Sequence, residues 1–319
     1  MTLPRYVLIA GHGRSGTNWL LNLMDLSTET HCRNEPNEIQ GTALSGLPGA
    51  QFAGVGGDVL ATSWDHAIEQ TSEKIGERDP RPLSPKRHIR PISRALGLDA
   101  LMYRPRMRSF AKWAHILTES GEWDVPFWLG NRRLLTNPLT VVKLVQTPGW
   151  ITWVLKNRPD VLVLHIVRHP GGFLNSWHHR YVAYAGIEAV TQDNAARIRS
   201  LIKLDKNWRS EIPDIDNMSV EESELWYWKY STETIYNAGK NLKNCQLIIY
   251  ENMTKDPKKY AEEIYQRCGL LWTEDVNAAI IASSQTSVDI ASAWTNRLDA
   301  NQISLAEKFV QSSLLKDFW

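Results

Sequence analysis

Short apolar runs alternate along the chain with segments whose apolar residues recur at helical spacing. Apolar runs at 6–9, 139–145 and 161–167 predict short strands. The run at 161–167 is continuous, which is typical of a parallel strand buried on both faces. Segments such as 148–157 predict helices between the strands. This alternation predicts an α/β protein in which a parallel sheet carries helices on both faces.

Weaker patterns extend this assignment over most of the remaining chain. Further strands are predicted at 30–33 and 245–250, further helices at 20–26, 65–75, 96–122, 194–208, 219 onward, 257–268, 274–283 and 301–315, and a polar loop at 284–300. Ser219 and Glu222 have the spacing of a capping box. Asp256 before Pro257 is a helix start, and Gly269 is the matching helix end.

A glycine-rich stretch lies between the first predicted strand and the first predicted helix. Glycines there let the backbone approach a ligand, and the first amides of the helix point at it with the helix dipole behind them. Arg14 adds a fixed positive fork to these amides. The residues predicted to hold an anion are Gly13, Arg14, Ser15, Gly16, Thr17 and Asn18. The sequence therefore predicts a phosphate-binding loop.

This loop departs from the common nucleotide-binding pattern. Gly11 and Gly16 have the spacing of that pattern, in which a lysine follows the second glycine. Here Thr17 follows Gly16 directly, and the basic residue lies earlier, at Arg14. The displaced charge argues against an ordinary ATPase or GTPase.

The residues from Gly13 to Leu20 read Gly-Arg-Ser-Gly-Thr-Asn-Trp-Leu, which resembles the 5′-phosphosulfate loop of the sulfotransferases. That family transfers a sulfonate group from 3′-phosphoadenosine 5′-phosphosulfate (PAPS) and leaves 3′-phosphoadenosine 5′-phosphate (PAP). The resemblance runs from 7 to 298 and is weak only across 41–136. It implies a P-loop-NTPase-like parallel sheet, PAPS as the cofactor, and transfer without a metal.

A second anion site is predicted where the strand at 161–167 ends. A phosphate-loop NTPase would carry an aspartate there to hold Mg²⁺, whereas this chain has Arg168. An arginine cannot bind a metal but can grip a phosphate. Ser176 follows eight residues later, and the pair resembles the 3′-phosphate site of the sulfotransferases.

Three further positions are assigned to the cofactor by the resemblance. Trp19 occupies the position that packs on the adenine ring in many members of the family. Trp294 and Arg297 lie in a segment that resembles the late loop closing over the cofactor, where Arg297 would add a contact to the 3′-phosphate. Tyr250 and Glu251 begin a segment that resembles a structural Tyr-Glu-Asp-Leu motif of the family.

The predicted catalytic residues are Glu35, Lys143 and Arg14. Arg14 is expected to clamp the leaving 5′-phosphate, because an arginine does not readily give up a proton. Lys143 resembles a family lysine that contacts the transferring sulfonate. No histidine follows it, so Glu35, in Asn-Glu-Pro after the second strand, is the predicted base. The alternatives are Glu38, His12, His31, His115 and His169.

Residues 41–136 are predicted to be a largely helical, irregular insertion into a single domain that spans 1–319. The segment lacks the strong periodicity of an independent core. It is expected to cap the acceptor site; the alternative is a decoration with no part in binding.

Composition restricts the setting and the partners. The chain has 319 residues, 43% of them apolar, so it is long enough to bury a large core. Its 36 basic and 35 acidic residues nearly balance, so no global charge favours nucleic acid or a membrane surface. Cys32, Cys245 and Cys268 lack the spacing of a metal site or a disulfide framework, which favours reducing cytoplasm. No apolar stretch of about 18 residues predicts a membrane span, and no signal peptide is expected.

The sequence thus predicts a cytoplasmic PAPS-dependent sulfotransferase, a monomer or homodimer. The expected acceptor is a small molecule with a hydroxyl or an amine, such as a specialised metabolite from natural product biosynthesis, with a cationic or polycyclic compound among the options. A carbohydrate or glycolipid acceptor is the alternative. A P-loop kinase and a non-catalytic PAP-binding module are alternatives of other classes.

Overall fold

A computed structural model describes residues 3–27, 29–38, 44, 47, 49–55, 57–73, 139–182, 187–213, 215–285 and 287–319. Its centre is a five-stranded sheet in the order β2-β3-β1-β4-β5, and every neighbouring pair of strands is parallel. The strands are β1 (Tyr6–Gly11), β2 (Thr30–Asn34), β3 (Leu139–Val145), β4 (Val161–Val167) and β5 (Cys245–Ile249). The α/β prediction is therefore confirmed.

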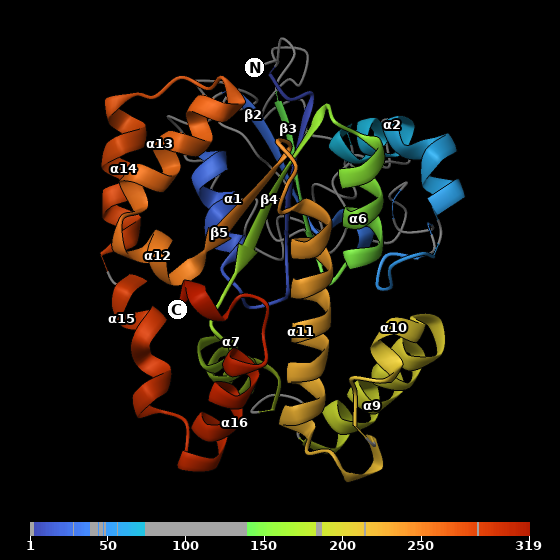
Figure 1. Ribbon diagram of the computed structural model, residues 1–319. Helices are drawn as coiled ribbons and strands as arrows, with labels where there is room; N and C mark the ends of the chain where they lie inside the picture. The colour runs from blue at the N-terminus through green and yellow to red at the C-terminus, as the bar shows by residue number, and fades with distance from the viewer. Residues whose placement is uncertain are drawn as a thin grey trace, which may run out of the picture.

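Helices cover both faces of this sheet (Figure 1). Their bounds are α1 (Thr17–Asp25), α2 (Gly57–Glu73), α6 (Pro148–Asn157), α7 (Pro170–Trp177), α9 (Ile187–Leu204), α10 (Lys206–Arg209), α11 (Val220–Gly239), α12 (Tyr250–Lys255), α13 (Pro257–Cys268), α14 (Glu274–Ser284), α15 (Ser287–Ser292) and α16 (Ala300–Gln311). The predicted caps are present, because the Ser219 and Asp256 side chains accept from backbone amides and Gly269 ends α13 with a φ of 67°.

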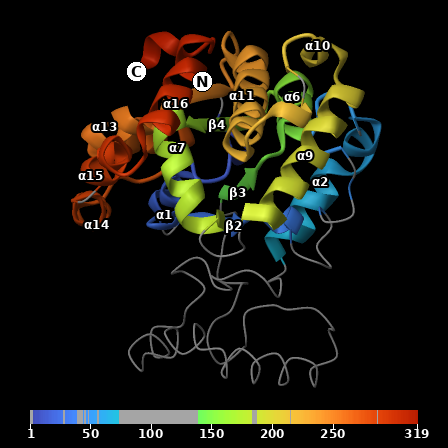
Figure 2. The same cartoon turned by 90° about the horizontal axis from the view of Figure 1, so that it is seen from below.

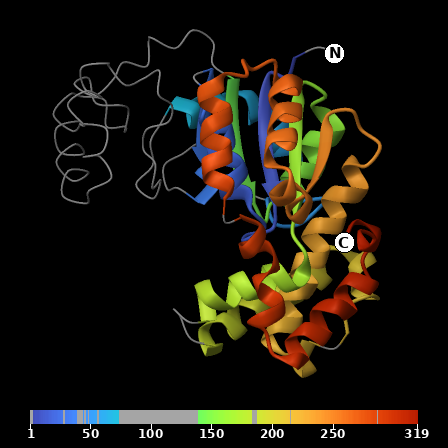
Figure 3. The ribbon, with the colours of Figure 1, turned by 90° about the vertical axis from the view of Figure 1, so that its left-hand side faces the viewer.

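Alternate residues of β1 explain the two cores. Val7 and Ile9 pack with α1 and α13 on one face of the sheet, whereas Leu8 and Ala10 pack with α2 and α6 on the other. Successive side chains of a strand point to opposite faces, so a central strand needs apolar residues throughout. In Figure 1, α1 and α13 lie to the left of the strands and α2 and α6 to the right, and Figure 3 looks at the sheet through the layer of α13.

The carboxyl ends of the strands face a group of helices beyond the sheet. Helices α7, α9 and α16, with the first half of α11, lie below this edge in Figure 1, and Figure 2 looks at the edge from their side. Loops that leave β1, β2, β3 and β4 therefore meet in one region. Ligands bind at this edge in open α/β sheets.

Three sequence predictions need correction. The helix predicted at 194–208 is α9, which begins at Ile187 and ends at Leu204. Helix α2 begins at Gly57 rather than 65, and its Leu60 and Trp64 lie in the core beside Trp150. The segment 284–300, predicted as a polar loop, instead forms α15 and a 3₁₀ turn at Ala293–Asn296. Ala291 packs into the core there, so burial of a small face overrides the polar pattern. Most of 41–136, including the predicted helix at 96–122, lies outside the described residues.

Candidate functional site

The turn between β1 and α1 forms the first part of the site. Arg14 has a φ of 68° and Gly16 a φ of 93°, so the chain turns sharply through left-handed conformations. A Cβ at Gly16 would lie 2.4 Å from the ring of Tyr250, which leaves no room for a side chain. Gly16 is also the N-cap of α1 and offers no side-chain cap. The first amides of α1 are thus left for another acceptor, as in helix-start anion sites.

The residues predicted for the two phosphate groups lie in contact. Arg14 Nε donates to Ser176 Oγ over 3.1 Å. One terminal nitrogen of Arg168 donates to the Arg14 carbonyl over 3.2 Å, and the other donates to the Ile290 carbonyl over 3.0 Å. The Arg168 guanidinium lies 4.7 Å from the ring centre of Tyr250. The ends of β1 and β4 therefore carry adjacent cations.

These two arginines have no ion-pair partner in the described part of the chain, and Glu251 acts on Arg168 only from a longer distance. Neither forms an ion pair with a described carboxylate, although Arg168 is only 5% exposed. Burial lowers the pKa of Arg168 from its ordinary value. Its Nε atom and the Ser15 hydroxyl are also buried with no hydrogen-bond partner among the described residues. A bound anion would satisfy these atoms and offset the charge, so the residues present fit a phosphate-bearing cofactor.

A lysine and a carboxylate meet at the ends of β2 and β3. Parallel pairing sets Lys143 beside Asn34, and Lys143 Nζ lies 2.6 Å from Glu35 Oε1. The same Nζ donates to the side-chain oxygen of Asn18 in the first turn of α1. Glu35 has a φ of 47°, and its backbone amide donates to the Lys143 carbonyl over 2.9 Å. Lys143 thus connects the predicted base to the phosphate loop.

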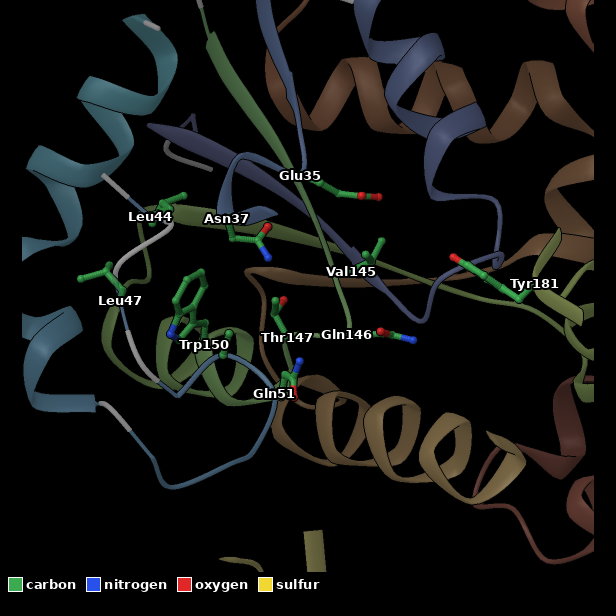
Figure 4. A pocket seen from close by; sticks show the side chains of 11 residues that line it. Glu35, Asn37, Leu44, Leu47, Gln51, Val145, Gln146, Thr147, Trp150 and Tyr181 are labelled. Atoms are coloured by element: carbon green, nitrogen blue, oxygen red, sulfur yellow. The ribbon is translucent and has the colours of Figure 1, made fainter. Parts of the chain in front are cut away.

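A cavity of about 350 Å³ opens beside this ion pair. It is lined by Glu35, Asn37, Leu44, Leu47, Ala50, Gln51, Val145, Gln146, Thr147, Trp150 and Tyr181 (Figure 4). Four of these residues belong to the start of the predicted insertion. That part of the predicted insertion therefore helps to line the cavity, and its role as a cap stays a prediction.

The remaining predicted cofactor residues are Trp19, Trp294 and Arg297. Trp19 is half-buried, with its ring centre 6.0 Å from that of Tyr250. Trp294 stacks on His169 at the start of α7, with ring centres 4.6 Å apart. Arg297 is exposed, and its side chain forms no hydrogen bond or ion pair within the described ranges. Their assignment to the cofactor stays a prediction.

The alternative histidine bases are engaged elsewhere. Burial lowers the pKa of His12 to about 3 and that of His169 to about 4. His169 Nδ1 accepts from the Gly171 amide as the N-cap of α7. His31 is buried in β2, whereas His115 and the side chain of Glu38 lie outside the described residues.

The sequence analysis missed Gln146 and the buried group behind it. Gln146 follows β3 directly, so its place at a carboxyl strand end was a usable signal. Behind it, His12 Nε2 lies 3.6 Å from Glu224 Oε1, and Arg197 donates to the other oxygen of Glu224. Nothing in the local pattern of α11 marks Glu224 as part of the site.

The described part of the structure contains neither a candidate membrane span nor a cluster of metal ligands. No described helix is long and apolar enough to cross a bilayer. Within the same residues, no three His, Cys, Asp or Glu side chains gather as a metal site.

Comparison with known proteins gives distant similarities. The sulfotransferase domain of a Synechococcus olefin synthase is 14% identical, with 95% of this chain and 94% of that chain covered and a TM-score of 0.43. A mouse sulfotransferase complexed with PAP is 12% identical, with coverages of 98% and 85% and a TM-score of 0.45. Sulfotransferase STF1 from Mycobacterium tuberculosis is 12% identical, with 97% of this chain and 77% of that chain covered and a TM-score of 0.42. No curated protein matches the chain.

The family model described as the sulfotransferase family matches residues 4–274. This match includes all five strands, the phosphate loop and the Lys143–Glu35 pair. The chain therefore belongs to the sulfotransferase family.

Proposed function

We propose that this protein transfers a sulfonate group from PAPS to a hydroxyl of a small molecule. The observation that carries the proposal is the contact between Arg14 and Arg168, two cations that form no ion pair with a described carboxylate. PAPS has phosphate groups on both sides of its ribose, so a pair of anion sites is the recognition it needs. The mouse family member complexed with PAP is consistent with this cofactor.

The two anion sites have different donors. The amides at the start of α1 and the Arg14 guanidinium would hold the 5′-phosphosulfate end. Arg168 and Ser176 would hold the 3′-phosphate, with Trp19, Trp294 and Arg297 around the rest of the nucleotide. The Gly13, Ser15 and Thr17 positions complete the cradle, and the Ser15 hydroxyl would gain the partner that it lacks.

The chemistry follows from the residues between the loop and the cavity. PAPS supplies an activated sulfonate when bound. Glu35 accepts the proton of the acceptor hydroxyl, and Lys143, which touches both Glu35 and Asn18, stabilises the negative charge that spreads over the sulfonate oxygens. Arg14 neutralises the leaving phosphate as a fixed charge. These side chains are already in position, so the reaction avoids the cost of reorganising solvent around the developing charges.

The cavity beside Glu35 is the proposed acceptor site. Its volume of about 350 Å³ suits a small molecule. Leu44, Leu47 and Gln51 bring the start of 41–136 to its wall, so we propose that this segment caps the site within a single domain. A carbohydrate or glycolipid would have to enter with one sugar ring.

Thermal shift with PAP, AMP and ATP tests the cofactor. PAP should raise the melting temperature well above AMP and ATP, and Arg168→Ala should remove that difference. Arg199→Ala is the matched control, since Arg199 is exposed and pairs with Asp216 away from the site. Equal stabilisation by AMP, or an unchanged response of Arg168→Ala, would refute the assignment. Mass spectrometry of acceptor mixtures with PAPS then separates an enzyme from a PAP-binding module.

A further inference from the structure

Gln146 lines the cavity, and most of its polar atoms lie within hydrogen-bond distance of a partner. Its backbone has a φ of 51°, a strained left-handed conformation for a residue with a side chain. The Gln146 amide donates to the Gly11 carbonyl over 3.1 Å. Its own carbonyl accepts from the Tyr227 hydroxyl over 3.4 Å, and its Nε2 lies 3.4 Å from His12 Nε2.

His12 determines the orientation of the side-chain amide of Gln146. His12 Nδ1 lies 3.1 Å from the Gly13 carbonyl, and a carbonyl can only accept, so Nδ1 carries the proton. Burial lowers the pKa of His12 to about 3, so the ring is neutral near pH 7 and its Nε2 is an acceptor. Nε2 therefore accepts from the Gln146 NH₂ group. The side-chain oxygen of Gln146 is left without a partner among the described residues.

The surroundings keep His12 in this place. The ring packs edge-on against Phe173 and Tyr227, with ring centres 4.7 and 5.7 Å away. Glu224 lies beside the same nitrogen, with its Oε1 atom 3.6 Å from His12 Nε2, and its charge is offset by Arg197. His12 and Glu224 are each 2% exposed. A rotation of the Gln146 amide would set its oxygen against the His12 lone pair, so the observed orientation is fixed by the buried group.

The rest of the cavity lining shows what the free oxygen would meet. Glu35 is the charged group of the described lining, and Lys143 already pairs with it, so no carboxylate is left over for a cation. The Thr147 hydroxyl is buried without a partner in the described part of the chain. Leu44, Leu47 and Trp150 supply an apolar wall. Neutral polar atoms thus face an apolar surface.

We infer that the side-chain oxygen of Gln146 determines acceptor specificity by accepting a hydrogen bond from a second hydroxyl of the acceptor. The inference rests on the proposed function, since Glu35 receives the hydroxyl that is sulfonated. The acceptor class is then a neutral diol or polyol on an apolar skeleton. One neutral hydrogen bond corresponds to a preference of roughly 3- to 10-fold over the mono-alcohol.

Three probes on one skeleton test this class: indanediol, indanol and aminoindanol. Their kcat/KM values with PAPS are measured by mass spectrometry, and their affinities for the PAP-bound protein by calorimetry. Wild type should prefer indanediol over indanol by about 3- to 10-fold. Gln146→Met should lose the preference and keep its affinity for PAP. Gln311→Met, an exposed change on α16, is the matched control and should retain the preference.

The outcomes distinguish this inference from the proposed function. Failure of wild type to bind PAP would refute the proposed function. Normal PAP binding without discrimination between diol and mono-alcohol would overturn only the inference. A Gln146→Met variant that folds, binds PAP and still prefers the diol would overturn it too. So would tighter binding of aminoindanol than indanediol, or no binding of any probe.

Discussion

The two sides of the site differ in whether their cations are paired with a carboxylate. On the arginine side, formed by Arg14, Arg168 and Ser176, two cations contact carbonyls, a hydroxyl and an aromatic ring. On the cavity side, formed by Glu35, Lys143 and Gln146, the cation is neutralised by a carboxylate. The lack of an ion-pair partner among the described residues marks the first side for an anion. A side-chain oxygen of Gln146 without a partner among the described residues marks the second for a neutral ligand.

The two sides also differ in how closely they are packed. Gly16 leaves no space beside Tyr250, whereas the cavity side keeps an open volume of about 350 Å³. A tight cradle suits a ligand that is always the same, and an open cavity suits one that differs between relatives. The predictions below change one side, the strand beneath both sides, or the residue that connects them.

Glu35→Gln should produce the largest change and affect the cavity side alone. The amide keeps the shape of the carboxylate but cannot take the acceptor proton, so kcat should fall by about 10²- to 10⁴-fold. PAP affinity, measured by calorimetry, should change little because Glu35 lies across Lys143 from the arginines. Full turnover would remove Glu35 from the mechanism. A large loss of PAP affinity would show that the two sides are not separate.

Gly16→Ala should destabilise the arginine side. A side chain at a φ of 93° is strained and meets the Tyr250 ring, which together should cost about 2–4 kcal/mol of unfolding free energy. Urea denaturation measures this loss. Gly13→Ala is the control, because its nearest neighbour would be 3.8 Å away. If Gly13→Ala keeps its stability but loses PAP affinity, the ligand approaches the backbone there; equal stability of both variants would contradict the packing argument.

Acid should weaken the fold beneath both sides through His165 in β4. Both of its ring nitrogens are buried without a partner in the described structure, and burial lowers its pKa to about 3. The unfolded chain binds the proton near pH 6.5, so unfolding is favoured as the pH falls from there toward 3. This residue contributes at most about 1.4 kcal/mol per pH unit. His165→Leu should flatten the decline in urea midpoints between pH 6 and 4. Parallel profiles for the two proteins would exclude His165 as the cause.

Asn18→Ala should give the smallest effect, because Asn18 connects the two sides. Its side-chain oxygen accepts from Lys143, and its loss removes one charge-assisted hydrogen bond. We expect kcat to fall by about 10-fold, with a smaller change in PAP affinity. Steady-state kinetics with varied PAPS separate the two constants. Asn207→Ala, on α10 away from the site, serves as the control.

Sequence patterns predicted the central strands well because burial dictates their composition. The bounds of β3, α6 and β4 agree with the prediction. For the two strands the reason is that parallel strands buried on both faces are made mostly of apolar residues. The segment 284–300 failed for the opposite reason. Its sequence is polar, and contacts of α15 with α12 and the core decide its structure.

In the candidate site, too, some residues could be predicted from the sequence and others could not. Glu35 and Lys143 were predicted from motifs, and the pairing of β2 with β3 brings them together. Gln146 was missed because its partner His12 is 134 residues away, just after the end of β1. Its orientation depends on which strand lies next to which, and local periodicity carries no information about strand order.

The ring of Tyr250 fills the place beside Gly16 and also lies under Arg168. One rigid side chain therefore sets the separation between the phosphate loop and the second arginine before any ligand arrives. Such preorganisation means that a nucleotide with two suitably spaced phosphates binds without first paying to assemble its site. A nucleotide with one phosphate leaves the second arginine buried and unsatisfied. The fixed geometry of the site therefore selects the nucleotide with two phosphates over the nucleotide with one. Because Gly16 and the Tyr250 ring are in contact, a change at one of them requires a change at the other.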